Sequence, residues 1–353
     1  MIQIRRGTVV EARATGHGTT DLVVEIAGVR AQAISYDALT GPVDVGDVVV
    51  LNTTAVALGL GTGGAHIVMA VEGREQPGDV SGHAMKLRYT PVQSSVDAIE
   101  QTRSDALDEV ASLQGMPVIA AGLHSALAPA VVAARAIDPS LRIAYVMTDG
   151  AALLMAFSET IPALREAGLL DTTITAGQAT GGDIEAISLY GALTAAKAIA
   201  RADVVVVSMG PGNLGSGSRW GHASIEVAAI VNAVAALEGT PVVVPRISFA
   251  DARERHRGLS HHTVTALSLA LARAQVTLPS LAPERAAEIR DRVQEVARKH
   301  DVIEVDLGTA EAALKESPVP LRSMGRSYED DPDFFRAAAA AGVHAATLAR
   351  ARR

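Results

Sequence analysis

The sequence contains no cysteine. This absence excludes disulfide bonds, thiolate nucleophiles, cysteine-ligated zinc sites and iron–sulfur clusters. The chain also lacks any run of about 18 apolar residues, the length needed to span a bilayer. Its opening residues, MIQIRRGTVVEA, do not contain the apolar stretch of a signal peptide. We therefore expect a soluble cytoplasmic protein that does not associate with membranes.

Basic residues are in the minority. The 353 residues include 31 Lys and Arg against 39 Asp and Glu, which gives a formal net charge of -8 at pH 7. Neutralising many phosphates requires a basic excess or a basic stripe, so we expect no appreciable affinity for nucleic acid. A local pocket for a small anion remains compatible with this composition. A homo-oligomer is also compatible with the sequence.

The chain changes character after its first quarter, and its length favours two domains at about 150 residues each. Up to residue 85, short valine-rich runs alternate with glycine-rich turns, a pattern typical of a small β-barrel or sandwich. From about residue 93, apolar strands alternate with helices, which predicts a mostly parallel, three-layer Rossmann-like α/β domain. We therefore expect a small β domain at residues 1–85 and an α/β domain at residues 86–353 that ends in an alanine-rich helix. Within it, residues 182–202 read as one long helix.

Polar and glycine residues follow several of the predicted strands. Ligands of open parallel sheets bind at the carboxyl ends of the strands, where helix N-termini also point. We therefore expect the residues after these strands to border one crevice. They are Gly122, His124, Ser125, Thr148, Asp149, Gly150, Gly181, Gly182, Asp183, Glu185, Gly210 to Gly217, Arg246, Ser248 and Asp251. The alternative is that these loops are polar only because they are exposed.

The segment SMGPGNLGSGSRWGH, residues 208–222, is the strongest single motif. Its glycines allow positive φ angles, so successive backbone N–H groups could form an anion-binding nest before a helix. The motif lacks the Gly-Lys-Ser/Thr of a Walker A loop and departs from GxGxxG. The predicted ligand contacts are Gly210, Gly212, Asn213, Gly215, Ser216 and Gly217, together with His124. A glycine-rich connection without a ligand is the alternative.

A second segment, RISFADARERHRGLSHHT at residues 246–263, concentrates positive charge. Guanidinium groups bind anions through paired hydrogen bonds, and histidine exchanges protons near neutral pH. We predict Arg246, Arg253 and Arg255 as ligand contacts. His261 and His262 are candidate acid–base residues, although adjacent positions point to different faces, so we expect only one to reach the site. The alternative is a solvated charged helix.

A divalent metal is an open possibility for the same edge. His124, His222, His261 and His262, with Asp149, Asp183 and Glu185, offer suitable ligand atoms, but no spacing is diagnostic of a metal site. Asp149 and Asp183 are predicted as metal ligands or orienting carboxylates. A Ser–His–Asp triad drawn from Ser125 or Ser208 is less favoured, because neither serine lies in a GxSxG motif.

Four segments together resemble a bacterial family that is described only as a domain of unknown function. They are SGHAMKLRYTPVQ at residues 81–93, SMGPG, RHRGLSHHT and SMGRSYEDDPDFF. The similarity runs across nearly the whole chain. It implies no catalytic residues, because no activity is assigned to that family.

Two functions from different classes are consistent with these patterns. The narrowly preferred one is a hydrolase or transferase of a phosphorylated or otherwise anionic small molecule, such as a nucleotide or sugar phosphate. His261, His262, Asp149 and Asp183 would then carry catalysis. The alternative is a non-enzymatic, ligand-sensing or regulatory module whose β domain contacts a protein or nucleic-acid partner.

Overall fold

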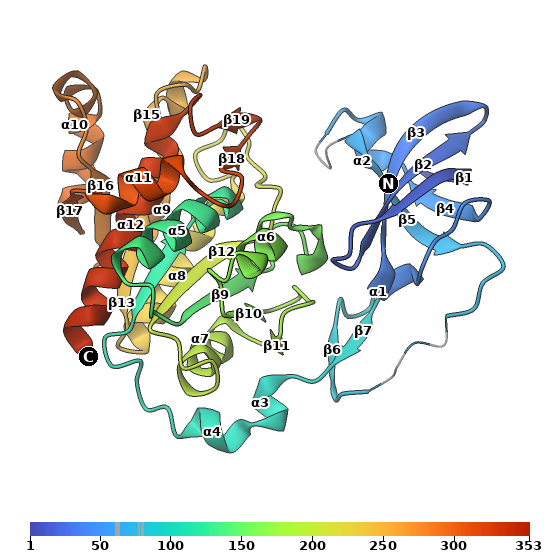
Figure 1. The fold of residues 1–353 in the computed structure, drawn as a ribbon, viewed down its shortest axis with the longest axis horizontal. Coiled ribbons are helices and arrows are strands. Elements are labelled where there is room, and N and C mark those ends of the chain that lie inside the picture. The colour runs from blue at the N-terminus through green and yellow to red at the C-terminus, as the bar shows by residue number, and fades with distance from the viewer. Residues whose placement is uncertain (61–63, 77, 79–80) are drawn as a thin grey trace. The chain divides into compact units, whose positions relative to one another are not determined.

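The computed structural model describes residues 1–60, 64–76, 78 and 81–353 (Figure 1). The chain folds into two compact units. The smaller comprises Met1–Ser81 and Leu87–Ser94, and the larger comprises Gly82–Lys86 and Ser95–Arg353. Residues 82–86 thus belong to the larger unit, although the chain then returns to the smaller one.

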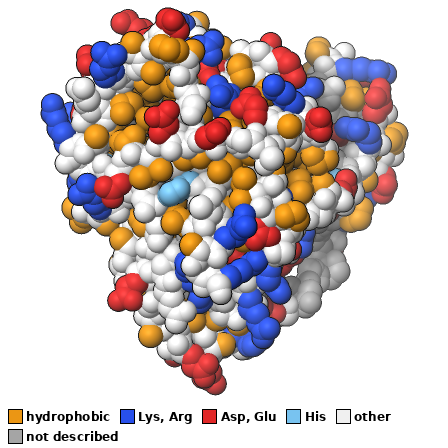
Figure 2. Space-filling view, turned by 60° about the vertical axis from the view of Figure 1, so that its left-hand side comes forward, with side chains coloured by type: hydrophobic (Ala, Val, Ile, Leu, Met, Phe, Trp, Pro, Cys, Tyr) orange, Lys and Arg blue, Asp and Glu red, His pale blue; other side chains and the backbone are white. Residues whose placement is uncertain are grey.

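The surface is mixed in character. On the face drawn in Figure 2, acidic and basic side chains are interspersed among apolar ones. Among the residues that the structure describes, no helix is long and apolar enough to cross a membrane.

The smaller unit is a closed five-stranded barrel with the strand order β1-β2-β3-β5-β4. Its strands are β1 (Ile4–Ala14), β2 (Thr19–Ile26), β3 (Val29–Tyr36), β4 (Val48–Asn52) and β5 (His66–Val71). Strands β3 and β5 pair in parallel, and the other pairs are antiparallel. Alternating valine and leucine side chains, such as Leu22 and Val24, fill the barrel. Two short helices accompany the strands, α1 (Asp37–Thr40) and α2 (Thr54–Ala57). The predicted β domain is confirmed as a barrel rather than a sandwich.

The larger unit is built on an eight-stranded sheet with the order β11-β10-β9-β12-β8-β13-β16-β17. All of its strand pairs are parallel. The strands are β8 (Pro117–Ala121), β9 (Ile143–Thr148), β10 (Thr172–Thr175), β11 (Ile184–Glu185), β12 (Val204–Met209), β13 (Thr240–Val244), β16 (Gln275–Pro279) and β17 (Asp301–Val305). The central strands β8, β9 and β12 are buried along their whole length because both faces of the sheet are covered.

Helices form a layer on each face, which gives the predicted three-layer α/β architecture. One face is covered by α5 (Leu127–Ile137), α6 (Thr160–Glu166), α11 (Thr309–Lys315) and α12 (Pro332–Arg352). The other is covered by α7 (Leu189–Ala198), α8 (Val227–Ala236), α9 (His261–Leu269) and α10 (Pro283–Ala297). Alternation along a strand divides the two cores, since Val206 packs in the first and Val205 in the second.

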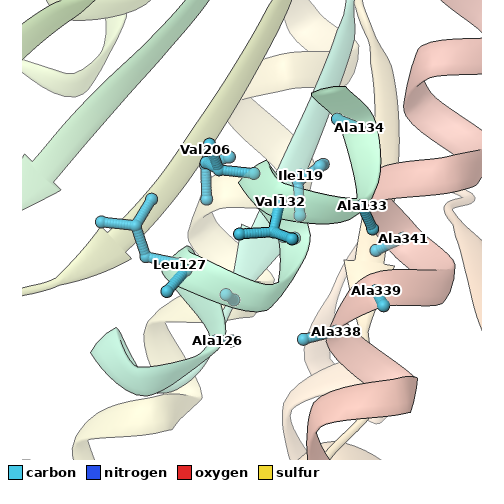
Figure 3. Packing of buried hydrophobic residues seen from close by; sticks show 14 of the residues in the cluster. Ile119, Ala126, Leu127, Val132, Ala133, Ala134, Val206, Ala338, Ala339 and Ala341 are labelled. Atoms are coloured by element: carbon cyan, nitrogen blue, oxygen red, sulfur yellow. The ribbon is translucent and has the colours of Figure 1, made fainter. Parts of the chain in front are cut away.

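The alanine-rich helix α12 packs closely against α5, as Figure 3 shows. Ala133 of α5 and Ala341 of α12 face one another there. A Cβ atom placed on Gly342 would overlap the carbonyl oxygen of Ala130. The small side chains of both helices therefore set their separation, and Gly342 allows the closest approach.

The remaining elements are short. They are β6 (Ala84–Lys86), β7 (Ser94–Val96), α3 (Ile99–Thr102), α4 (Ser104–Asp108), β14 (Ile247–Ser248), β15 (Gly258–Leu259), β18 (Arg322–Ser323) and β19 (Arg326–Ser327). The buried Lys86 anchors the first of them, because its Nζ lies 2.7 Å from Glu185 Oε2 and 2.6 Å from the carbonyl oxygen of Ala179.

One predicted helix is wrong in its first part. Residues 182–202 begin with the two-residue strand β11, and α7 starts only after Ser188, whose hydroxyl caps it. Asp183 precedes β11 and receives a 2.9 Å hydrogen bond from the backbone N–H of Thr173. Asp183 thus lies near the amino end of β10, not at the carboxyl edge where we expected it. A two-residue strand leaves too short an apolar pattern to be separated from the helix that follows.

The strand order points to one place for a ligand. From β8 the chain moves to β9 on one side, and from β12 it crosses to β13 on the other side of β8. Such a reversal leaves a crevice at the carboxyl ends of the strands around it. The loops after β8, β12 and β13 are therefore where a site is expected.

Candidate functional site

Four histidines cluster at this edge, drawn from the loops after β12 and β13. His222 precedes a 3₁₀ turn at Ala223–Glu226, His256 ends another turn, and His261 and His262 begin α9. The ring centroids of His261 and His262 are 4.4 Å apart, and those of His256 lie 5.0 and 4.6 Å from them. His222 stacks on His262 with centroids 3.8 Å apart and ring planes 7° from parallel.

Local structure holds these rings together. Strands β14 and β15 pair with each other, so the segment from Arg246 to Ser260 doubles back on itself. Ser260 then caps α9, where its Oγ accepts a 3.2 Å hydrogen bond from the backbone N–H of His262. The same Oγ lies 2.8 Å from Nδ1 of His256. One capping serine thus positions two of the four histidines.

The expectation that only one of the adjacent histidines would reach the site stays a prediction, since His262 lines the cavity at this edge and His261 does not. Both rings nevertheless join the cluster, since His261 and His262 are tilted neighbours. The argument from faces assumed that the site lies beside the helix. The cluster instead gathers at the end of α9, where consecutive residues of the first turn can point toward one place.

Several imidazole nitrogens of the cluster are buried without a hydrogen-bond partner. They are Nδ1 and Nε2 of His222, Nδ1 and Nε2 of His262, and Nε2 of His261. His222 is 5% exposed and His262 only 4%. Leaving a buried polar group unsatisfied costs about 1–3 kcal/mol. A concentration of such atoms at the edge of a parallel sheet therefore points to a bound group that satisfies them.

Burial and neighbouring positive charge keep these histidines neutral. Burial, followed by the neighbouring histidines and Arg246, lowers the pKa of His262 to about 2. Burial with Arg246 and Arg253 lowers the pKa of His256 to about 3. The pKa of His261 is also lowered, by burial and then by Arg255. Neutral imidazoles accept protons or bind metal ions, and they are not proton-donating imidazolium groups.

Beside the histidines lies a group of three arginines and two carboxylates. Arg246 is 8% exposed, and its Nη2 lies 3.0 Å from Asp251 Oδ2. Asp251 also pairs with Arg253 at 2.8 Å and with Arg326 at 3.9 Å. Arg326 is in turn 3.1 Å from Asp331. Three guanidinium groups thus face two carboxylates, which leaves one positive charge in excess within this group of side chains.

A small, mostly apolar cavity lies between His262, Arg246 and the residues that follow β8. It has a volume of about 30 Å³, and its lining includes Gly122, Ser224, Arg246 and His262. Ser224 Oγ donates a 2.8 Å hydrogen bond to the carbonyl oxygen of Gly122 and lies 3.2 Å from Asn213 Oδ1. The glycine-rich loop is thereby tied to the cavity through Asn213.

The glycine-rich loop itself packs against the cluster. Gly215 forms a β-bridge with His222, and a Cβ added to it would lie 3.3 Å from His262 Cε1. Gly212 has a φ angle of +103°, a backbone conformation that residues other than glycine rarely adopt. Gly210 is enclosed by Ala152, whereas Ser216 and Gly217 are exposed. The N–H of Ser216 bonds to the carbonyl oxygen of Gly221 at 2.7 Å, so it is used within the loop.

The other predicted site residues lie outside this group. His124 is buried with Nδ1 3.0 Å from Tyr145 Oη and Nε2 2.7 Å from Ser158 Oγ, so both nitrogens are engaged. Burial lowers the pKa of His124 to about 4. Asp149 Oδ2 accepts a 2.9 Å hydrogen bond from the N–H of Gln178. Asp183 forms an ion pair with Arg165 at 2.8 Å, and Arg255 is exposed.

Glu226 was not among the predicted site residues, and the structure places it at the same edge. Burial raises the pKa of Glu226 to about 7. Thr148, the last residue of β9, donates a 2.9 Å hydrogen bond to its Oε2. Perturbed carboxyl groups are frequent in functional sites. A glutamate shortly after a glycine-rich loop and before an apolar helix was the available signal.

Comparison with known families places the chain. It belongs to the family described as protein of unknown function (DUF3866), whose model matches residues 32–342. This confirms the resemblance seen in the sequence. No match is found among curated proteins. One of the segments that carry the resemblance reaches the site, since Ser248 Oγ of the loop after β13 donates a 2.6 Å hydrogen bond to Asp331 of SMGRSYEDDPDFF.

Proposed function

We propose that this member of a family without an assigned activity binds an anionic small molecule at the carboxyl edge of β8, β12 and β13, and hydrolyses it or transfers its anionic group. A phosphorylated metabolite such as a nucleotide or sugar phosphate is the preferred ligand class. One observation carries the proposal. The buried, unpartnered imidazole of His262 and the buried guanidinium of Arg246 border the same small cavity.

The arginine group supports an anionic ligand. Asp251 is shared among Arg246, Arg253 and Arg326, so its two oxygens do not saturate their N–H donors. The Nε of Arg246 is buried and has no hydrogen-bond partner. The side chain of Arg253 is 49% exposed, so a ligand can reach it. Guanidinium groups bind phosphate and carboxylate oxygens with two parallel hydrogen bonds.

The size of the cavity limits what enters it. A volume of about 30 Å³ admits a water molecule or a small ion but not a nucleotide. In the proposed complex, only the anionic group of the ligand approaches Arg246 and His262. The rest of the ligand lies over the exposed part of the glycine-rich loop, at Ser216 and Gly217.

The proposed chemistry follows from the protonation of the site. His261 and His262 are neutral, and their lowered pKa values make them weak proton acceptors, so in the proposed mechanism they hold an electrophile. Glu226, with a pKa of about 7, is the carboxyl group at this edge that is suited to proton transfer near neutral pH. Asp149 remains a candidate orienting carboxylate. The ion pair of Asp183 with Arg165, near the amino end of β10, removes it from the proposed mechanism.

Ligand binding tests the first part of the proposal. We expect at least one member of a panel of nucleotides, sugar phosphates, phosphate and sulfate to raise the melting temperature. Arg253→Gln should weaken the binding of that ligand by about 10- to 100-fold, because a charge-assisted hydrogen bond is worth about 1.5–3 kcal/mol. Arg257→Gln is the matched control, since Arg257 lies in the same segment with similar exposure and pairs with Glu288. A panel without any stabilising anion would contradict the proposal.

Turnover tests the second part. Release of phosphate from the ligand identified above would be followed for the wild type and His261→Ala. Because His261 would hold an electrophile that activates the ligand, we expect His261→Ala to lower the rate by about 10²-fold or more. Full turnover by His261→Ala would remove that residue from the mechanism. Tight binding without turnover would favour the ligand-sensing alternative.

A further inference from the structure

We propose that His256, His261 and His262 bind one divalent transition-metal ion of the zinc class. This deepens the proposed function, because the ion would lie at the same edge as the anion. The metal can nevertheless be measured without any anionic ligand.

The distances between the three side chains suit a shared ion. One ligand atom from each of His256, His261 and His262 can be chosen so that all three lie within 4.8 Å of one another. Nitrogen donors around a tetrahedral zinc ion, with Zn–N near 2.0–2.1 Å, are ~3.4 Å apart. Small rotations of the imidazoles therefore bring the three nitrogens to bonding distance. The rings come from one short segment, with the spacing His-x₄-His-His.

The lone pairs that a metal requires are available. Nε2 of His261 and both nitrogens of His262 are buried without hydrogen-bond partners. Nδ1 of His256 is engaged with Ser260 Oγ at 2.8 Å. When that nitrogen carries the proton and donates it to Ser260, Nε2 of His256 is left with its lone pair. Metal-binding histidines are commonly oriented by such a hydrogen bond on the other ring nitrogen.

His222 has a different role. Its ring is nearly parallel to that of His262, with centroids 3.8 Å apart. A metal ion lies close to the plane of an imidazole that binds it, and one ion cannot lie in two parallel planes at this separation. We therefore assign His222 as a positioning residue that holds the ring of His262, rather than as a fourth ligand.

The donor set indicates the class of metal. Three neutral imidazoles suit zinc, copper and nickel, whereas magnesium and calcium prefer oxygen ligands. The absence of cysteine removes thiolate competition. Three protein donors leave a tetrahedral ion one position for water or substrate, as in catalytic zinc sites.

The surrounding charges bear on the binding of a cation. Arg246 and Arg253 oppose it, but Asp251 lies between them and offsets part of their charge. The excess positive charge that remains would favour an anion or hydroxide at the open position of the ion. The arginines and the metal would thus bind the same anionic group from two sides.

Direct metal titration tests this inference on the full-length chain. Protein freed of metal by a chelator is titrated calorimetrically with Zn²⁺, and we expect one ion per chain. His261→Ala should weaken Zn²⁺ at least ~100-fold, since loss of an outer-shell partner alone costs about 10- to 100-fold. Ser260→Ala should give the smaller, outer-shell loss. His17→Ala, in the barrel, is the control for adventitious binding and should leave the affinity unchanged.

Two optical signals report on the location of the ion. Co²⁺ bound by three imidazoles should give the visible absorption of a tetrahedral site, which His261→Ala should lose. Trp220 is the single tryptophan and lies two residues before His222, so Co²⁺ should quench its fluorescence. If His261→Ala does not fold, as judged by circular dichroism, His261→Asn replaces it.

Absence of Zn²⁺ binding by the wild type, equal affinity in the His261 variant, or equally good binding of Mg²⁺ would overturn the inference. The unpartnered nitrogens would then be satisfied by water. Phosphate is titrated separately into the metal-free and Zn²⁺-loaded proteins. Phosphate binding without any Zn²⁺ site would refute the metal and leave the anion site standing. If Zn²⁺ binds but no anion stabilises the protein, the anion site is refuted and the metal site stands.

Discussion

The two units treat their charged groups in opposite ways. On the barrel, ion pairs such as Arg13–Asp21 and Arg6–Glu72 lie at the surface, where water solvates both partners. None of the Lys, Arg, Asp or Glu residues that the structure describes in the barrel strands is buried. In the larger unit, Arg246, Asp251, Asp331 and several imidazoles are buried at one edge of the sheet.

This difference distinguishes residues that stabilise the fold from residues that are suited to bind a ligand. Solvated ion pairs cost little and contribute little. Buried groups without partners destabilise the protein, so they are retained where a ligand compensates for them. His66 of the barrel has one such nitrogen, but a single atom does not form a site. The comparison therefore assigns chemistry to the edge of the larger unit.

The largest expected effect on stability concerns the packing of α5 against α12 in the larger unit. In Gly342→Leu, the new side chain collides with the backbone of α5 at Ala130, and we expect a loss of about 3 kcal/mol or more. Hydrogen exchange followed by mass spectrometry should show faster exchange in α5 and α12, with the barrel unchanged. Ala351→Leu, at an exposed position of the same helix, is the control. Unaltered exchange in α5 would contradict the packing described.

The next effect is the pH dependence of stability. The pKa of Glu226 is raised from 4.5 to about 7, so the folded protein holds this proton more tightly than the unfolded chain. Its contribution to stability is therefore greatest below pH 4.5, falls as pH rises to about 7, and is constant above. The change is on the order of 3 kcal/mol at 1.36 kcal/mol per unit. Urea unfolding between pH 4.5 and 8 should show a smaller decline in Glu226→Gln. Identical curves for the two proteins would show that Glu226 is not buried as described.

Replacement of two buried histidines of the larger unit should affect stability differently. His124→Leu removes a ring whose nitrogens are both hydrogen-bonded, and we expect a loss of about 2 kcal/mol. His262→Leu removes two unsatisfied nitrogens, so the metal-free protein should be unchanged or more stable by about 1 kcal/mol. Denaturant unfolding of both variants checks this pair. Equal destabilisation would indicate that His262 also serves the fold.

The smallest effect is expected on the barrel. Arg6 pairs with Glu72 while its side chain is 73% exposed. Arg6→Ala should change the free energy of unfolding by less than about 1 kcal/mol, and the difference should shrink further in high salt. A larger, salt-resistant loss would show that barrel charges are not simply solvated.

Much of the fold could be predicted because the spacing of apolar residues along the sequence reflects which positions are buried. Strands such as β12, with the sequence VVVVSM, are apolar on both faces and could belong only to a covered sheet. The valine-rich runs of the first 85 residues likewise indicated the barrel. The strand β11 was missed because two residues are too few to show a pattern of apolar and polar positions. The displaced position of Asp183 follows from that error, since its place depends on Ile184 pairing beside Ile174.

The site was harder to predict because the hydrogen-bond partners of a side chain are distant in the sequence and cannot be identified from it. His124 and His262 both follow or adjoin strand ends, yet Tyr145 and Ser158 satisfy the first and nothing satisfies the second. The grouping of His222 with His262 depends on how two loops fold over one another. The pKa of Glu226 depends on its burial against β9, and the residues around Glu226 in the sequence do not predict that burial.

The most direct test of the account is anomalous X-ray diffraction from crystals soaked separately with Zn²⁺ and with selenate, an anomalous analogue of sulfate. The account predicts a zinc peak at ~2.0–2.1 Å from imidazole nitrogens of His256, His261 and His262, and a selenate peak beside Arg246 and Arg253. Strong peaks on the barrel, with none at the carboxyl edge of the larger unit, would contradict it.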